Sequence, residues 1–145
     1  MTVFVANEQD LPVDETRLGS LARHALAEED VDPSCELSVL LVTSGHIRHL
    51  NSRFAGNDYA TDVLAFPMSD GDDQDDPPLL GDVVICPEVA ARNASKFGHG
   101  LPGEMDVLIV HGTLHLLGYD HQRDDDKARM DKRMRQILDS FRVGA

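Results

Sequence analysis

The sequence predicts an α+β domain in which about five helices pack on a small mixed β-sheet of about four strands. Short apolar runs alternate with segments in which apolar residues recur at helical spacing, in the order βαβαββααα. The chain has 145 residues, 41% of them apolar and 27% charged, which is typical of a globular protein with a substantial core. Because no internal repeat or linker divides the sequence, we expect residues 1–145 to form a single domain.

The first third of the chain contains two expected strands with a helix between them. Residues 2–6 are expected to form a short strand. Asp14 is positioned to cap a helix that runs to about residue 29, with one apolar face for burial. Residues 36–43 form a nearly continuous apolar run, which predicts a strand buried within the sheet. The apolar face of the helix comprises Leu18, Leu21, Ala22, Ala25 and Leu26.

The middle of the chain predicts a second helix, a pair of strands and an acidic loop. Ser44 is positioned to cap the helix, which should point Ile47, Leu50 and Phe54 inward and end at Gly56. Strands are expected at residues 61–66, ended by Pro67, and at residues 81–86. Residues 69–78 contain five Asp and no basic residue, so we expect a mobile loop that is too polar to pack.

The last third predicts three helices. Pro87 should begin the first of them and Gly98 should end it. Residues 104–117 form the second helix, with Gly118 as its C-terminal signal. Residues 124–141 form the third, and its Met-containing apolar stripe indicates core packing rather than a cofactor site. The stripe comprises Met130, Met134, Ile137, Leu138 and Phe141.

The charge distribution argues against a protein that coats nucleic acid through bulk electrostatics. The formal net charge is −13. The basic residues are concentrated near the C-terminus, where residues 123–142 hold seven of the 13 Lys and Arg beside five acidic residues. Most of these basic side chains are expected to lie on a solvated, ion-paired helix face.

The remaining composition predicts a cytoplasmic protein. The apolar stretches are too short to cross a bilayer, and the first ten residues lack the features of a secretory signal. Two cysteines do not make a disulfide framework, so Cys35 and Cys86 are expected to be buried, inert thiols.

The strongest functional signal is the segment HGTLHLLGYDH, at residues 111–121. His111 and His115 are four residues apart on a predicted helix and therefore share one face. Gly118 permits the chain to turn back and to bring His121 toward them. Three imidazoles with an open fourth position are the ligands of a catalytic Zn²⁺, so we expect one zinc ion per chain. The alternative is a pair of hydrogen-bonded core histidines, because the rest of this helix is apolar and should be buried.

The histidine spacing is similar to that of the metzincin peptidases, with one difference. In those enzymes a glutamate follows the first histidine and acts as the general base. Here that position is Gly112, which has no side chain. The resemblance therefore supports the metal geometry and argues against peptidase chemistry.

The same segment resembles the signature of the YbeY endoribonucleases. TDVLAFP at residues 61–67 is similar to the family's TDVLSFP, and LGDVVICPEVA at residues 80–90 is similar to its Gly-Asp strand and following helix. Leu50, Asn51 and Glu104 also fall where the family pattern has them. The resemblance implies a zincin-like fold with Zn²⁺ on His111, His115 and His121, which act as catalytic residues.

It further implies a single-strand-specific endoribonuclease that processes the 3′ end of 16S rRNA and acts in ribosome quality control. The implied partners are single-stranded rRNA, the small ribosomal subunit and an assembly GTPase, with no DNA and no membrane. One departure matters: Ala55 stands where many family members have an arginine. Arg48 is a possible substitute, although a solvated helix side chain is the simpler interpretation.

Several other polar residues are candidates for supporting roles. Asp120 adjoins a predicted ligand, so it would orient an imidazole, act as a base, or only form the turn after the helix. Tyr119 is expected to be a wall of the pocket. Asp62 and Asp82 sit beside strands, where a structural role is favoured. The isolated histidines are expected to be surface residues: His24, His46 and His49.

Two rival functions remain at this stage. One is a non-catalytic ribosome-assembly factor with a structural metal, which Ala55 and the acidic surface favour. The other is a metallohydrolase of a different substrate. For the endoribonuclease itself, the sequence leaves open whether a metal-bound hydroxide or the RNA 2′-OH attacks the phosphodiester.

Overall fold

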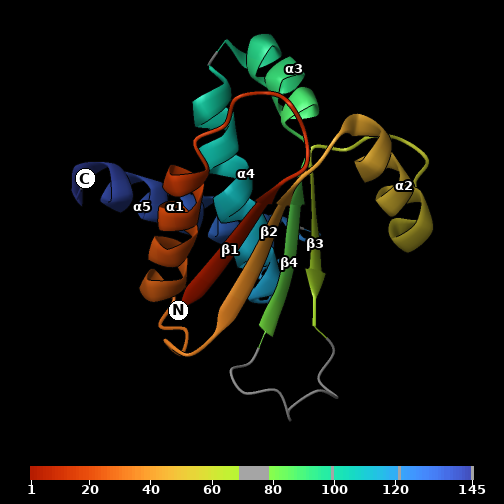
Figure 1. Cartoon of the computed structure of the whole chain (residues 1–145). Coiled ribbons are helices and arrows are strands. Elements are labelled where there is room, and N and C mark those ends of the chain that lie inside the picture. The colour runs from red at the N-terminus through yellow and green to blue at the C-terminus, as the bar shows by residue number, and fades with distance from the viewer. Residues whose placement is uncertain (69–78, 99, 121, 145) are drawn as a thin grey trace.

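The computed structural model describes residues 1–68, 79–98, 100–120 and 122–144. Within this part of the chain the elements follow the predicted order (Figure 1). The predicted acidic loop at residues 69–78 lies outside the described residues. The strands are β1 (Thr2–Asn7), β2 (Glu36–Leu41), β3 (Val63–Pro67) and β4 (Leu79–Ile85). The helices are α1 (Glu15–Glu28), α2 (Ser44–Ala55), α3 (Pro87–Phe97), α4 (Leu101–Leu116) and α5 (Asp124–Gly144).

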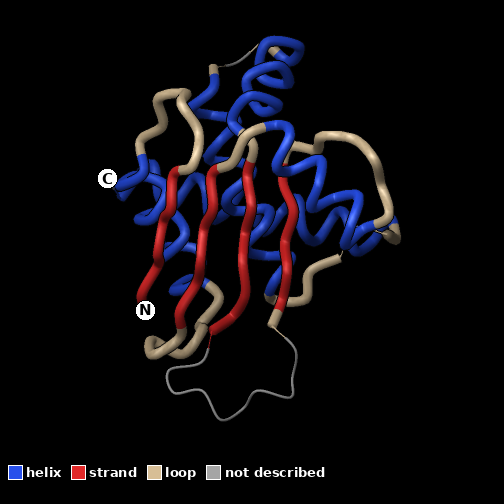
Figure 2. The backbone as a smooth tube through the Cα atoms, turned by 45° about the vertical axis from the view of Figure 1, so that its right-hand side comes forward, coloured by secondary structure: helices blue, strands red, loops and turns tan. Residues whose placement is uncertain are grey.

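The four strands form one mixed sheet in the order β1-β2-β4-β3. Strands β1, β2 and β4 are parallel, and β3 lies antiparallel to β4 at the edge. The tube view shows the strands side by side, with helices covering one broad face (Figure 2). The predicted α+β class and the mixed sheet are therefore confirmed.

Strand β2 is central, as its apolar run predicted, yet only one of its faces is fully buried. Leu37, Val39 and Leu41 point into the main core, while the intervening residues are only partly buried. The main core lies between the sheet and helices α1, α4 and α5. The opposite face carries a smaller cluster beneath α2, consisting of Val42, Ile47, Val84, Cys86 and Val89.

Helix α2 differs from the sequence prediction at both ends. Thr43 is its N-cap rather than Ser44, because Thr43 has extended backbone angles and its Oγ1 accepts a hydrogen bond from the His46 amide at 3.3 Å. Phe54 was expected to point inward, but it is 62% exposed. The last turn of α2 extends beyond β3 (Figure 1), so the Phe54 ring meets the sheet only edge-on at Phe66, with ring centroids 5.6 Å apart.

The other predicted boundaries hold to within a few residues. Asp14 caps α1 as expected, Pro87 begins α3, and Gly98 ends it with a positive φ of 74°. Helix α4 begins at Leu101 instead of Glu104, because Pro102 fits its first turn. Cys35 and Cys86 are both buried free thiols, and burial raises the pKa of each thiol, as expected for inert cysteines. No helix in the described ranges is both long enough and apolar enough to cross a membrane.

Helices α1 and α4 are joined by an ion pair at their N-terminal halves. Asp106 has a side chain only 5% exposed, and it accepts hydrogen bonds from Arg17 Nε at 3.2 Å and Nη2 at 2.9 Å. Arg142 of α5 lies 3.9 Å from the same carboxylate. The pair therefore compensates a charge that the core would otherwise exclude.

We expect Arg17→Met to lower the free energy of unfolding by about 1–3 kcal/mol, because it leaves the buried Asp106 with only a distant cation. Urea denaturation measures this loss. The exposed pair Arg48–Asp58, whose atoms approach to 2.9 Å, provides the control. Arg48→Met should leave the free energy of unfolding nearly unchanged, because solvent screens an exposed pair. An equal loss in the two variants would contradict this explanation of the buried pair.

Candidate active site

Helix α4 presents two histidines as a stacked pair. The His111 and His115 rings have centroids 6.4 Å apart and planes inclined by only 6°. The predicted sharing of one helix face is therefore confirmed for these two residues. Rings that are parallel and one turn apart can direct their nitrogens toward a common point beside the helix.

The sequence-based expectation of a fully buried helix was wrong for this face. His111 is half-buried and His115 is exposed, whereas the other faces of α4 lie in the core. The reason is that α1, α3, α5 and the sheet pack on the apolar sides of α4, whereas the described residues leave the histidine side only partly buried. A metal bound here would retain access to water and substrate, which a catalytic site requires.

The end of α4 reverses the chain as predicted. Gly118 adopts a φ of 99°, a left-handed conformation that side chains disfavour. The Gly118 amide donates to the His115 carbonyl and the Tyr119 amide donates to the Leu114 carbonyl, both at 3.1 Å. This pair of bonds is a Schellman motif. His121 lies outside the described residues, so its approach to the pair stays a prediction.

The donor chemistry fits zinc. Two imidazoles on one partly open helix face match the ligand type and spacing of a three-histidine site. Among the described residues, no three His, Cys, Asp or Glu side chains lie close enough together to bind a metal ion. The third predicted ligand, His121, is not one of the described residues.

Packing at Gly112 explains why no glutamate follows the first histidine. A Cβ atom placed there would lie 2.6 Å from Val83 Cγ1 and 3.4 Å from Val63 Cγ2. Helix α4 thus contacts the sheet closely at the turn that carries His111. A side chain at this position would point into the sheet and not toward the histidine pair, so the metzincin base has no place here.

Asp120 forms a turn in this structure. Its Oδ1 accepts a hydrogen bond from the Gln122 amide at 2.9 Å, which matches the structural alternative considered for it. Asp120 also lines a pocket of about 390 Å³, as does Tyr119, which was expected to be a wall. The other lining residues are Leu117, Gly118, Asp126 and Arg129.

The remaining acidic candidates, Asp62 and Asp82, lie in different surroundings. The Asp62 carboxylate accepts a hydrogen bond from the side-chain amide of Asn93 at 3.2 Å. The backbone carbonyl of Asp62 accepts another from the backbone amide of Cys86 at 2.9 Å. Asp82 instead lines a separate, mostly apolar groove of about 360 Å³ between α2 and the sheet. Within the resemblance motifs, buried Asn51 donates from Nδ2 to the Tyr59 carbonyl at 3.0 Å and so holds the loop before β3.

The structure adds contacts for three other residues that the sequence did not specify. His24 was expected at the surface, but its Nε2 lies 2.7 Å from Ser140 Oγ and its ring packs on Phe141. Arg48 is paired with Asp58, so the substitute for the missing arginine at Ala55 is already engaged. Most basic residues of the last helix were expected on a solvated, ion-paired face; Arg133 is ion-paired, but with the largely buried Glu29 across the α1–α5 interface.

Comparison with known proteins places this chain in a defined enzyme class. Proteins named Endoribonuclease YbeY from Salinispora tropica and Thermobifida fusca are 43% and 44% identical, over 98% of this chain and at least 95% of their own length. One from Frankia casuarinae is 47% identical over 97% of this chain and 75% of its own. The chain is therefore an endoribonuclease, a hydrolase that acts on RNA. A family model described as Endoribonuclease YbeY matches residues 4–142, so the chain belongs to the endoribonuclease YbeY family.

A solved structure supports the same architecture. The solution structure of TM1509 from Thermotoga maritima superposes with a TM-score of 0.61 and is 26% identical. The match covers 98% of this chain and 93% of that one. The arrangement of helices on a mixed sheet is thus shared over nearly the whole length.

Proposed function

We propose that this enzyme is a zinc-dependent, single-strand-specific endoribonuclease that processes the 3′ end of 16S rRNA and contributes to ribosome quality control. It would act in the cytoplasm on RNA and not DNA, together with the small ribosomal subunit and an assembly GTPase. The observation that carries the metal proposal is the stacked His111–His115 pair on a face of α4 where, among the described residues, His111 is half-buried and His115 is exposed. The Schellman reversal that follows supports His121 as the third ligand.

The chain's own residues would hold and orient the reacting groups. His111, His115 and His121 would bind one Zn²⁺ through neutral imidazoles, and the close packing of Gly112 fixes the helix turn between the first two. When bound, the zinc ion would supply a Lewis acid and lower the pKa of a coordinated water toward about 7. Asp120 would orient the turn that presents His121.

RNA binding has to overcome the net charge of −13. Several arginines in the described residues are already paired with carboxylates, including Arg17, Arg48 and Arg133. Free RNA should therefore bind weakly, with strong dependence on salt. The small ribosomal subunit would compensate by positioning its own RNA beside the histidine pair.

A second candidate is a non-catalytic assembly factor with a structural metal. The exposed Ala55 has no positive charge, and Arg48 is paired with Asp58, so neither side chain offers an unpaired cation for an RNA phosphate. Structural zinc sites, however, are usually closed by four protein ligands. The open histidine face of α4 therefore favours the catalytic proposal.

Metal removal distinguishes the two candidates. We expect about one Zn²⁺ per chain after loading, and chelation should abolish cleavage of single-stranded RNA while the circular dichroism of the fold is largely kept. Duplex RNA and single-stranded DNA of the same sequence are the substrate controls. Global unfolding on chelation would support a structural metal, and chelator-resistant cleavage would refute zinc dependence.

A further inference from the structure

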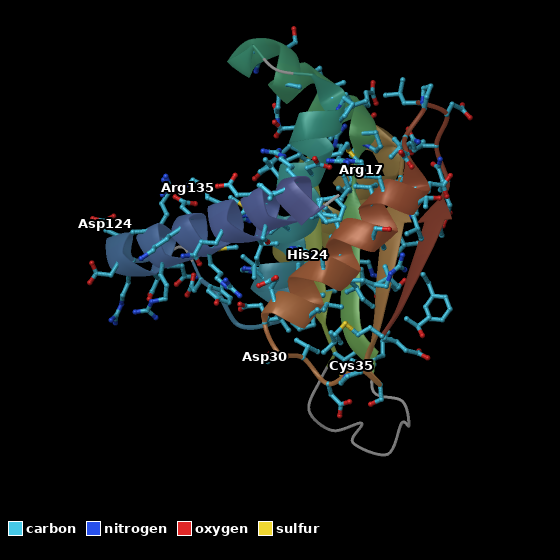
Figure 3. All side chains as sticks on the ribbon, turned by 90° about the vertical axis from the view of Figure 1, so that its left-hand side faces the viewer. Arg17, His24, Asp30, Cys35, Asp124 and Arg135 are labelled. Atoms are coloured by element: carbon cyan, nitrogen blue, oxygen red, sulfur yellow. The ribbon has the colours of Figure 1, made fainter. Side chains whose placement is uncertain are left out.

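The face of the sheet opposite α1, α4 and α5 carries a groove beside α2. In Figure 3, α1 with Arg17 and His24 and α5 with Arg135 lie to the left of β1, on the side of the main core. Val83 of β4 points into that core, so the next residue, Asp82, points to the opposite side. The groove there has a volume of about 360 Å³, which is within the range of sites for small ligands. Its apolar lining includes Leu40, Val42 and Leu50.

Two phenylalanines form an aromatic wall of this groove. The Phe54 side chain at the end of α2 is 62% exposed, and its ring meets that of Phe66 on β3 with planes inclined by 72°. An exposed ring held in this way can stack on a flat ligand. Arg53 Cζ lies 5.4 Å from the Phe54 ring centroid. The wall therefore offers a stacking surface with a positive charge at its rim.

Asp82 is the acidic residue of the groove. Its neighbours on the adjacent strands are Phe66 of β3 and Ser38 of β2. Asp82 is half-buried, and within the described ranges its carboxylate forms no hydrogen bond or ion pair. A partly buried carboxylate without a protein partner is unusual, because burial removes part of its hydration. It is suited to a ligand that donates hydrogen bonds.

The charges around the groove favour a nucleotide over other occupants. A basic side chain of a partner protein would suit Asp82, but Arg53 already lies beside the Phe54 ring and would repel it. A second copy of this chain would bring another net charge of −13 toward the same face. A nucleotide complements both charges, since its base donates N–H groups and its phosphate attracts an arginine.

We propose that this groove binds one unstacked base of the RNA substrate, stacked on Phe54 and hydrogen-bonded to Asp82. Guanine fits best, because its adjacent N1–H and N2–H groups can donate two parallel hydrogen bonds to one carboxylate. Uracil fits worst, because its single N–H lies between two carbonyls that a carboxylate repels. The inference rests on the proposed single-strand specificity, since a paired base exposes neither its ring face nor its Watson–Crick edge.

The groove lies across the edge strand β3 from the histidine helix. Val63 and Val83 face α4 at Gly112, whereas Phe66 and Asp82 lie on the other face of the same two strands. An RNA strand that passes the β3 edge can place a base in the groove and its backbone on the side of α4. The groove residues therefore select the base and take no part in breaking the phosphodiester bond.

Mononucleotides test the groove without the nuclease reaction, because they contain no internucleotide bond. The ratio of the affinities for 5′-GMP and 5′-UMP isolates the base, since the phosphate is common to both. We expect 5′-GMP to bind at least about tenfold more tightly and to shift the amide resonances of Phe66 and Asp82 in an NMR titration. Asp82→Asn should remove most of this preference. Arg53→Gln should weaken 5′-GMP binding and keep the ratio.

Phe54→Leu tests the stacking and should weaken 5′-GMP binding about tenfold. Its matched control is Phe4→Leu, because Phe4 is also an exposed phenylalanine, at 53%, and lies on the same face of the sheet outside the groove. Phe4→Leu should bind 5′-GMP as the unmodified protein does. Circular dichroism of each variant verifies that the fold is kept.

Equal affinities for the two nucleotides, or NMR shifts confined to α4, would overturn the base site. An equal loss in Phe4→Leu would overturn it as well, since the stacking would then be unspecific. Binding of an octa-arginine peptide that Asp82→Asn abolishes, without nucleotide binding, would replace it with a protein-docking groove. Failure of the proposed function is distinguishable: equal cleavage of duplex and single-stranded RNA would refute the single-strand specificity, whatever the mononucleotides show.

Discussion

His115→Ala is expected to reduce cleavage of single-stranded RNA by at least about a hundredfold, because changes merely behind a metal ligand already cost 10–100-fold. His115 is exposed on α4, so the substitution leaves no cavity in the core. Activity and bound zinc should therefore fall together while the melting temperature of the metal-free protein stays nearly constant. Cleavage assays, metal analysis and thermal denaturation of the same preparations measure these three quantities.

The control for this variant is His49→Ala on α2. His49 is another exposed helical histidine, and it belongs to a helix on the opposite face of the sheet from α4. It should retain full activity and full zinc content. Residual cleavage in His115→Ala at the level of His49→Ala would show that the histidine pair does not serve catalysis, or that a contaminating nuclease is being measured.

Substitutions at Gly112 are expected to have the second largest effect, on stability. Gly112→Ala places a Cβ 2.6 Å from Val83 Cγ1, in a fully buried contact. The overpacking should lower the free energy of unfolding by about 1–3 kcal/mol. Gly112→Glu, which introduces the residue type that metzincins have at this position, should fail to fold stably because it adds a buried charge. Urea denaturation measures the first variant, and soluble yield and circular dichroism the second.

Two controls separate the close contact from helix propensity. Gly103→Ala lies in the same helix with no atom within 4 Å of the new Cβ, so stability should be unchanged or rise by up to about 1 kcal/mol. Val83→Ala removes the γ-carbons that Gly112→Ala meets, so Gly112→Ala should cost less in that background. Additive losses in the double variant would contradict the proposed contact.

Most of the fold could be predicted because its signals are local. The apolar stripe of α1, the Asp14 cap and the glycine stops at Gly56 and Gly98 each depend on residues close together in the sequence. The orientation of Phe54 could not be predicted in this way. Its helical spacing is correct for an inward face, but α2 covers too little of the sheet to bury its last turn.

The candidate site likewise combines features that the local sequence predicts with features that depend on tertiary packing. The spacing of His111 and His115 predicted their shared face, since four residues complete about one helical turn. The exposure of the two histidines depends on which elements pack around α4, and the apolar sequence of the helix does not predict those neighbours. The contact between Arg133 and Glu29 joins residues 104 positions apart, so no local sequence pattern predicts it.

The most direct test of the proposed function is the position of cleavage in a single-stranded RNA that spans the 3′ end of small-subunit rRNA. The zinc-loaded enzyme and His115→Ala would be compared, each with and without the small ribosomal subunit, and the product ends would be sequenced. We predict a defined cut at the mature 3′ end, stronger with the subunit present and absent in His115→Ala. No zinc-dependent cleavage under either condition, or equal cutting by both proteins, would contradict the proposed rRNA-processing activity.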